Sequence, residues 1–417
     1  MTSPLQAQDR VLPLAGLCII EFSHMIMGPS SGLILGDLGA DVIKIEPLGL
    51  GDNTRRVPGS GAGFFTSFNR NKRSLALDLK NPKAIALVHK LIARADAVTE
   101  NFRPGALDTL GLGYDALEKI NPRLIYCSLK GFLSGPYEDR SALDEVVQMM
   151  GGLAYMTGPP GRPLRAGASV NDIMGGMFAV IGILSAVQER QRTGRGQYIK
   201  SALFENVAFL VSPHMAQFAV TGQAAAPMPA RQAAWAIYEI FQSQDELPIF
   251  IGVVSDTQWR AFCTEYDRPD LAADERLITN AQRVVARDWL IPELTRVFGA
   301  FSCAEIAAKC ERARLAFAPV TKPEELFDDP HLAMPGAMVG VSFPDGRTLP
   351  LPALPLEMDG HRFGLRHDIA RVGEHGPEIA RELGLSDRDI ETLIAEGVLG
   401  AGTQARTETD TMPVAKA

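Results

Sequence analysis

The amino-acid sequence predicts an α/β protein with a doubly wound parallel sheet in a large domain and with a second, smaller domain. The first half of the chain alternates short β-branched runs with helical stretches, which is typical of a parallel sheet covered by helices. An Ala- and Pro-rich stretch at 221–230 interrupts this pattern, and a further strand and several helices follow it. The 417 residues, 46% of them apolar, suffice for two to three domains.

The alternation can be followed along the chain. In the large domain we expect strands and helices, in chain order, at 17–22, 30–38 (helix), 41–45, 84–93 (helix), 97–99 and 124–128. In the smaller domain we expect a strand at 249–254. Near the C-terminus, Ser386 and Asp389 have the spacing of a capping box, and Gly397 ends the helix that they begin.

These breaks divide the chain into domains. We expect residues 1–222 to form the first part of the large domain and 223–325 the small domain. Residues 326–400 would then return to the large domain, passing through an extended Pro-rich segment at 349–356. Residues 401–417 are small, polar and aperiodic, which predicts a disordered tail.

The composition excludes several classes of partner. A net charge of −8 argues against a nucleic-acid or anionic-membrane surface. The longest nearly apolar run, 173–187, is too short to span a bilayer, and no secretory signal is visible at the N-terminus. The five cysteines are scattered and lack metal-ligand spacing, so we expect a cytoplasmic protein with no metal site.

The first strand–helix–strand unit resembles a dinucleotide site, because Glu46 ends its second strand. The turn at 23–29 nevertheless lacks the GxGxxG glycines, and Pro29 removes an amide donor, so we do not expect NAD. His24 lies in this turn, at the edge of the sheet where open α/β folds bind ligands. It is either a ligand contact or a hydrogen-bonded turn histidine.

The strongest local signal is the segment 165–172, which precedes an apolar helix expected to begin at Ile173. Asp172 stands at the start of that helix, where free N–H groups and the helix dipole favour an ionised carboxylate. Such a group could act as an oxygen nucleophile, with Gly175 and Gly176 leaving room for a substrate. Alternatively, Asp172 only caps the helix.

Basic residues form a second group. They are either solvated surface charges or a site for a polyphosphate ligand. The group comprises Arg55, Arg56, Arg70, Lys72, Arg73, Lys80, Arg103 and Lys130.

An ordered set of motifs carries a family resemblance from about residue 14 to 400. The motifs are GDLGADVIKIEP (36–47), GD-N-TR (51–55), NRNKRSLALDLK (69–80), ENFRPGALDTLG (100–111), SLKGF (128–132), ND (171–172) and RTGRGQ (192–197). Together they resemble the class III coenzyme A transferases, the family typified by formyl-CoA and carnitine CoA-transferases.

The resemblance implies a Rossmann-type large domain built from both ends of the chain and an interlocked homodimer. It also implies that Asp172 attacks the donor thioester and that CoA passes through an aspartyl-CoA thioester to the acceptor carboxylate. CoA would enter only as an acyl-CoA substrate, with no tightly bound cofactor.

The same matching assigns the CoA contacts. His24 to Met27 would lie along the pantetheine arm. The adenosine end and a phosphate would be bound by Leu77, Lys80, Asn101, Phe102, Arg103 and Lys130. Pro47 and Thr109 replace family arginines, so Arg103 or Arg55 would take over the phosphate contacts.

The segments 142–158 and 231–241 are similar to the subgroup that uses succinyl-CoA and C4–C5 dicarboxylic acids. The distal carboxylate of such an acid requires a cation, and Arg165 and Arg231 are the candidates. Two alternatives are a 2-methylacyl-CoA racemase and a non-catalytic CoA-binding protein. The racemase is disfavoured, because Leu143 replaces the histidine of its GHD motif.

Overall fold

The structure, a computed structural model, describes residues 11–230, 234–342 and 346–402. They fall into two compact units. One takes in the described parts of Met1–Pro229 and His331–Ala417, and the other is formed by Ala230–Pro330. The sequence predicts both boundaries a few residues earlier, after 222 and after 325. From residue 403 on, the predicted disordered tail lies outside the described residues.

Six strands form the sheet of the larger unit, in the order β3-β2-β1-β4-β5-β6. They are β1 (Cys18–Phe22), β2 (Asp41–Glu46), β3 (Lys72–Ala76), β4 (Ala97–Glu100), β5 (Ile125–Lys130) and β6 (Tyr198–Ala202). All neighbouring pairs are parallel, which confirms the predicted parallel α/β sheet. Between β1 and β4 the strand order reverses, and open α/β sheets bind ligands beyond such a point.

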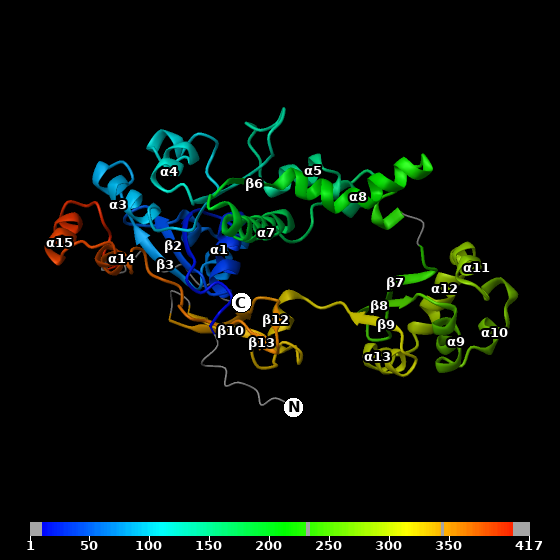
Figure 1. Ribbon diagram of the computed structural model, residues 1–417. Helices are drawn as coiled ribbons and strands as arrows, with labels where there is room; N and C mark the ends of the chain where they lie inside the picture. Colours follow the sequence, from blue (N-terminus) through cyan, green and yellow to red (C-terminus); the bar gives the residue numbers. More distant parts are fainter. Residues whose placement is uncertain (1–10, 231–233, 343–345, 403–417) are drawn as a thin grey trace. The chain divides into compact units, whose positions relative to one another are not determined.

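One face of the sheet is covered by helices from both ends of the chain (Figure 1). These are α3 (Pro82–Ile92), α4 (Tyr114–Ile120), α14 (Gly376–Glu382) and α15 (Asp387–Ala395). Ile379 and Ile390 share a core with Leu87 and Val98, so the C-terminal helices complete the N-terminal sheet. The predicted capping box is present at the start of α15, and a left-handed Gly397 follows its end.

The opposite face is covered by α1 (Met27–Asp37), α7 (Val170–Thr193) and α8 (Leu203–Thr221). Helices α1 and α7 pack closely through two glycines. A Cβ at Gly175 would lie 2.3 Å from Met27 Cε, and one at Gly176 would lie 2.0 Å from Ser30 Oγ. The expectation that these glycines leave room for a substrate is therefore wrong, because they leave room for α1.

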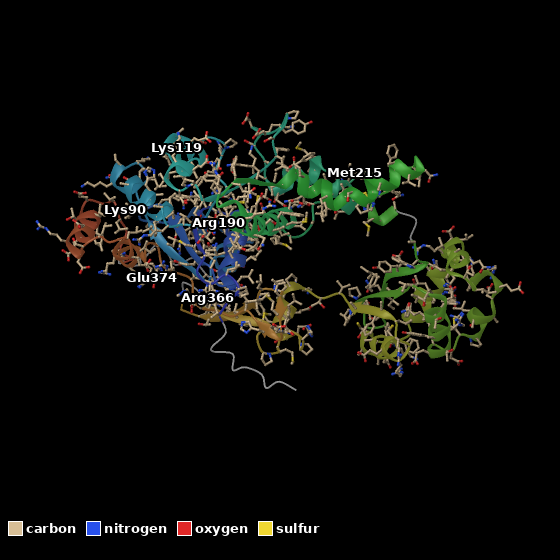
Figure 2. The ribbon with its side chains drawn as sticks, viewed as in Figure 1. Lys90, Lys119, Arg190, Met215, Arg366 and Glu374 are labelled. Carbon is tan, nitrogen blue, oxygen red and sulfur yellow. The ribbon has the colours of Figure 1, made fainter. Side chains whose placement is uncertain are left out.

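Helix α7 is long and apolar enough to cross a membrane by length and composition alone. Here it lies against α1, β5 and β6, with Ala179, Val180 and Ile183 in the core. Near its end, Arg190, which Figure 2 labels, donates from Nη2 to Asp96 Oδ1 at 2.7 Å, and this bond ties the helix to the start of β4. These contacts are those of a central helix in a folded domain.

Shorter elements complete this unit. They are α2 (Phe64–Phe68), α5 (Asp144–Met150), α6 (Leu153–Thr157) and the two-stranded pairs β10 (Met338–Ser342) with β11 (Thr348–Pro352) and β12 (Glu357–Met358) with β13 (His361–Arg362). The segment predicted as extended at 349–356 thus forms a strand only in its first part.

The smaller unit has an antiparallel sheet, ordered β7-β8-β9, and a helical layer on one face. Its strands are β7 (Ile237–Gln242), β8 (Pro248–Val253) and β9 (Ala316–Pro319). Its helices are α9 (Asp256–Glu265), α10 (Pro269–Ala273), α11 (Asn280–Val285), α12 (Arg287–Phe298) and α13 (Cys303–Arg312). Ile237, Phe241 and Ile251 face the helices and share a core with Phe262 and Phe298.

Candidate active site

The turn between β1 and α1 lies at the switch point of the sheet. His24 N donates to Asn101 Oδ1 at 3.1 Å, and Asn101 Nδ2 donates to His24 O at 2.8 Å. The next residue, Met25, has a left-handed backbone (φ +62°), and its N–H donates to Thr54 Oγ1 at 2.8 Å. Polar contacts from two other segments thus fix a backbone conformation that costs energy for a non-glycine residue.

The imidazole of His24 has an unsatisfied ring nitrogen among the described residues. Its backbone is bonded, yet its buried Nδ1 has no hydrogen-bond partner among the described residues. The ring lies against Phe102, with ring centroids 5.4 Å apart. Burial lowers the pKa of His24, so the ring is neutral at physiological pH. The structure therefore brings together three predicted contacts, His24, Asn101 and Phe102, at one sheet edge.

Asp172 is the third residue of α7 and is half-buried. One helical turn further on, Gly175 touches Met27 at the start of α1. Because these two helices pack closely, Asp172 lies about one helical turn away from the point where the β1–α1 turn ends and α1 begins.

The pKa of Asp172 is raised to about 7 by burial and by the negative charges of Asp144 and Glu145. The expected effect of the helix start, which favours the ionised carboxylate, is outweighed here, so this group is only partly ionised at neutral pH. No hydrogen bond to the Asp172 carboxylate occurs within the described ranges. The first-turn donor Asn171 N instead donates to Asp144 Oδ1 at 2.9 Å.

Asp144 is a functional candidate that sequence reasoning missed. It is buried in the first turn of α5, where Gln148 Nε2 donates to its Oδ2 at 2.5 Å. Gln148 Oε1 in turn accepts from Ala166 N at 2.8 Å, so one chain of hydrogen bonds fixes the segment that leads into α7. The sequence signal for it is an acidic residue next to Leu143, in the stretch that corresponds to the racemase GHD motif.

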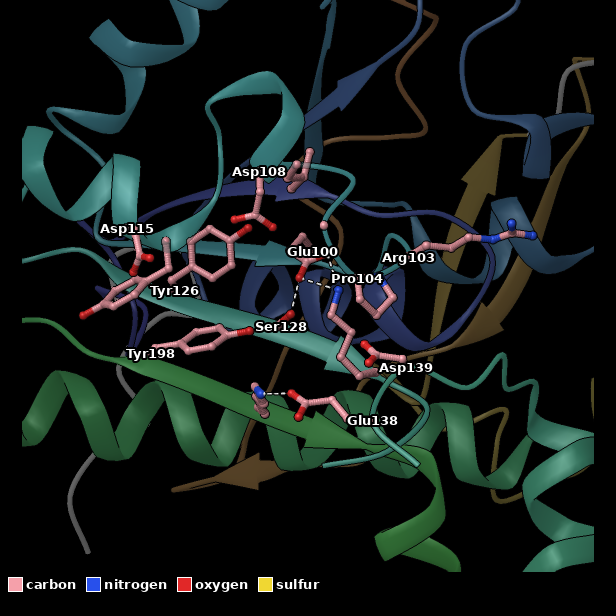
Figure 3. Close-up of a pocket in the computed structure, with 15 residues that line it drawn as sticks. Glu100, Arg103, Pro104, Asp108, Asp115, Tyr126, Ser128, Glu138, Asp139 and Tyr198 are labelled. Carbon is pink, nitrogen blue, oxygen red and sulfur yellow. Dashed lines mark hydrogen bonds and ion pairs between the residues drawn. The ribbon is translucent and has the colours of Figure 1, made fainter. Parts of the chain in front are cut away.

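A pocket of about 210 Å³ opens beside β4, β5 and β6 (Figure 3). Two predicted CoA contacts, Arg103 and Lys130, line it, together with Tyr126 and Tyr198. The charge of Lys130 is already paired, because its Nζ lies 2.8 Å from Glu100 Oε1 and donates to Phe102 O at 2.7 Å. Arg103 is exposed at the pocket.

The other two predicted adenosine contacts lie elsewhere in the unit. Leu77 is buried in the core, and its backbone pairs with Leu399. Lys80 is exposed just beyond β3, where its backbone N–H donates to Asp78 Oδ1. Their contact with CoA stays a prediction.

Most of the basic residues singled out in the sequence form structural ion pairs. In four of these residues a side-chain nitrogen lies 2.5 to 2.8 Å from a carboxylate oxygen. The pairs are Arg55–Glu46, Arg70–Asp37, Lys72–Glu21 and Arg73–Asp41. Arg55 also donates to Ala370 O and lies over the Phe65 ring, whereas Arg103, the other proposed phosphate contact, forms no ion pair with the described residues. Because the Glu46 carboxylate forms an ion pair with Arg55, it is not free to bind a ribose.

Arg165 and Arg231 are the two candidate residues for binding the distal carboxylate, and the structure describes only Arg165. Arg165 lies on the exposed segment that leads into α7, with its Nη1 2.8 Å from Glu145 Oε1. Arg231 lies outside the described residues.

The chain is similar to known proteins over most of its length. The model of CoA-transferase family III matches residues 14–376. A succinate–glutarate CoA-transferase of Agrobacterium fabrum is 32% identical over 91% of this chain and 98% of its own length. An acetyl-CoA:oxalate CoA-transferase of Acetobacter aceti is 36% identical over 80% of this chain and 87% of its own. The crystal structure of a CaiB/BaiF family protein from Brucella suis superposes with a TM-score of 0.80 at 33% identity, covering 90% of this chain and all of that one.

Proposed function

The chain belongs to CoA-transferase family III, and we propose that it moves CoA from succinyl-CoA to a small C4–C5 dicarboxylate through covalent intermediates on Asp172. The observation that carries this proposal is the position of Asp172. The carboxyl group is half-buried, lies one helical turn from the β1–α1 turn and belongs to the first turn of a helix packed tightly on α1.

The proposed reaction has four balanced steps. An Asp172 carboxylate oxygen attacks the donor thioester carbonyl, and CoA thiolate leaves to give a mixed anhydride. The thiolate then attacks the aspartyl carbonyl, forming an aspartyl-CoA thioester and releasing the donor acid. The acceptor carboxylate attacks this thioester and expels thiolate again. The thiolate finally attacks the acceptor carbonyl of the second anhydride, giving the product acyl-CoA and free Asp172.

The environment of Asp172 supports this role. A pKa of about 7 leaves a large fraction ionised at neutral pH, and a partly desolvated carboxylate is a better nucleophile than a hydrated one. His24, Met27, Asn101 and Phe102 are the residues proposed to line the pantetheine path, and Arg103 at the pocket is the proposed phosphate contact.

The names of the relatives support a dicarboxylate acceptor. Both curated relatives carry a dicarboxylate in their names, glutarate in one and oxalate in the other. The proposed cation for the distal carboxylate is Arg165 or Arg231. Arg165 would exchange its exposed contact with Glu145 for the substrate, which costs little because exposed ion pairs are weak.

We also propose a homodimer, interlocked as the sequence resemblance implies. An apolar stripe on α7, formed by Ile173, Met177 and Ile181, is exposed in the single chain, as is Met215 on α8 (Figure 2). Contiguous exposed apolar side chains on a soluble protein favour a protein partner.

The experiment that tests this function is an acceptor panel with succinyl-CoA, followed by mass spectrometry of the CoA esters. We expect transfer to malate, citramalate, itaconate or glutarate to exceed transfer to formate or carnitine. Incubation with a 2-methylacyl-CoA in deuterated water tests the racemase alternative, for which rapid α-deuteration would count. CoA binding without any transfer would instead identify a non-catalytic CoA-binding protein.

A further inference from the structure

Two buried lysines bind the backbone on either side of the β1–α1 turn, one where β1 ends and the other in the first turn of α1. Lys44 Nζ donates to Ser23 O at 2.6 Å, and Lys72 Nζ donates to Pro29 O at 2.9 Å. Ser23 begins the turn and Pro29 lies in the first helical turn of α1. The two ammonium groups therefore hold the two ends of the segment that carries His24 and Met27.

Both ammonium groups are held by one carboxylate. Glu21 Oε1 accepts from Lys44 at 3.2 Å, and Glu21 Oε2 accepts from Lys72 at 2.8 Å. A second carboxylate, Asp52, lies 3.0 Å from Lys44 Nζ, so two positive and two negative charges balance in a fully buried cluster. Burial lowers the pKa of Lys72 to about 8, which leaves it charged at pH 7.

The cluster also reaches the middle of the turn. Asp52 Oδ1 accepts from the Thr54 hydroxyl at 2.8 Å, and Thr54 Oγ1 accepts from the strained Met25 N–H at 2.8 Å. A continuous polar chain therefore runs from Glu21 on β1 through Lys44 and Asp52 to the turn.

Helix α1 is shaped to accept this cluster. A Cβ at Gly32 would lie 1.7 Å from Glu21 Oε2 and 2.9 Å from Lys72 Nζ, so only glycine lets the helix lie against the charges. Apolar side chains of similar volume stabilise a core about as well as a buried ion pair does. What an ammonium adds here is the hydrogen bond to a carbonyl of the turn.

We propose that Lys44 and Lys72, fixed by Glu21, are positioning residues for CoA transfer, which hold the β1–α1 turn in the conformation that receives acyl-CoA beside Asp172. This inference rests on the proposed function, because that function assigns the turn to the pantetheine arm. Neither lysine touches the reacting atoms; each acts through the backbone of the turn.

The test compares Lys72→Met and Lys44→Met with Arg70→Met. Arg70 forms an equally buried ion pair with Asp37 and makes no contact with the turn in the described structure, so it is the matched control. We expect amide hydrogen exchange at residues 23–29 to rise in both lysine variants. In Arg70→Met, amide exchange at residues 23–29 should stay unchanged. The variants are compared at temperatures at which they have lost the same amount of stability. In the lysine variants kcat/KM for succinyl-CoA should fall about 10- to 100-fold, as for other small misplacements of a binding group.

A charge-balanced double variant, Glu21→Gln with Lys72→Met, separates the effect on the position of the β1–α1 turn from the effect on the stability of the protein. We expect its melting temperature to recover toward that of the unmodified protein while its Kd for CoA stays raised. Recovery of CoA affinity together with stability would overturn the inference, as would equal exchange at residues 23–29 in Lys72→Met and Arg70→Met. If the unmodified protein binds no CoA, the proposed function fails, and the exchange comparison still decides whether the lysines position the turn.

Discussion

His24 and Asn101 exchange two hydrogen bonds across the switch point of the sheet, one from His24 N to Asn101 Oδ1 and one from Asn101 Nδ2 to His24 O. One residue follows β1 and the other follows β4, so the Asn101 side chain ties together the loops that follow these two strands. These loops carry four of the residues proposed to contact CoA.

Asn101→Ala should therefore weaken CoA binding. Both hydrogen bonds are lost and the His24 backbone loses its partners, which costs about 1 to 3 kcal/mol, or about 5- to 150-fold in Kd if the loss falls on binding. Calorimetric titration with CoA measures it. The control is Asn121→Ala, since Asn121 Nδ2 also donates to two carbonyls of this unit, but at the amino ends of β4 and β5, the opposite edge of the sheet. Equal losses of CoA affinity in the two variants would contradict the assignment.

The pH dependence of transfer should follow the raised pKa of Asp172. The nucleophile must be ionised, so kcat/KM for the acyl-CoA should rise with pH through about 7 and fall to about a tenth of its plateau at pH 6. Asp144→Asn removes a negative charge that opposes ionisation, so the rise should move to lower pH. Glu391→Gln, an exposed position on α15, should leave the profile unaltered. A profile already flat above pH 5 would show that Asp172 titrates normally.

Arg165→Gln should change acceptor choice more than overall activity. A bidentate contact between a guanidinium and a carboxylate contributes about 1.5 to 3 kcal/mol, so specificity for dicarboxylates over monocarboxylates should fall about 10- to 150-fold. Arg162→Gln, in the same exposed segment, is the control. The same assay on Arg231→Gln tests the second candidate. If neither variant alters the preference, the distal carboxylate is bound by another group.

Sedimentation should give about twice the chain mass of 45.1 kDa, with no monomer on dilution to nanomolar concentration. Interlocked chains cannot separate without unfolding, and the apolar stripe on α7 would otherwise face water. Met177→Glu and Ile181→Glu place charges in this stripe and should reduce the yield of folded dimer. A folded, active monomer would refute the proposal.

The sequence predicted the elements whose signals are local. The β-branched runs predict strands at 41–45 and 124–128, and the structure has them at 41–46 and 125–130, while Ser386 and Asp389 mark the start of α15 as predicted. What failed depended on neighbours distant in the chain. Gly175 and Gly176 face α1 rather than a substrate, because their packing partners lie about 150 residues earlier.

The electrostatics of the site could not be predicted for the same reason. The pKa of Asp172 depends on burial and on Asp144, which belongs to another helix. By sequence, Lys72 is a candidate phosphate ligand. In the structure its Nζ instead donates to Glu21, 51 residues away in the chain. The hydrophobic periodicity of a sequence shows which face of a helix or strand is apolar. It does not show which charged side chain from another segment lies against that helix or strand.

Whether Asp172 carries CoA can be measured by intact-mass spectrometry of the protein after mixing with succinyl-CoA alone, followed by peptide mapping. We expect a CoA adduct on Asp172 in the unmodified protein. In Asp172→Ala, which should retain the fold and bind CoA, we expect no adduct and no transfer. An adduct that persists in Asp172→Ala, or that maps to another residue, would contradict the role of Asp172 as the nucleophile.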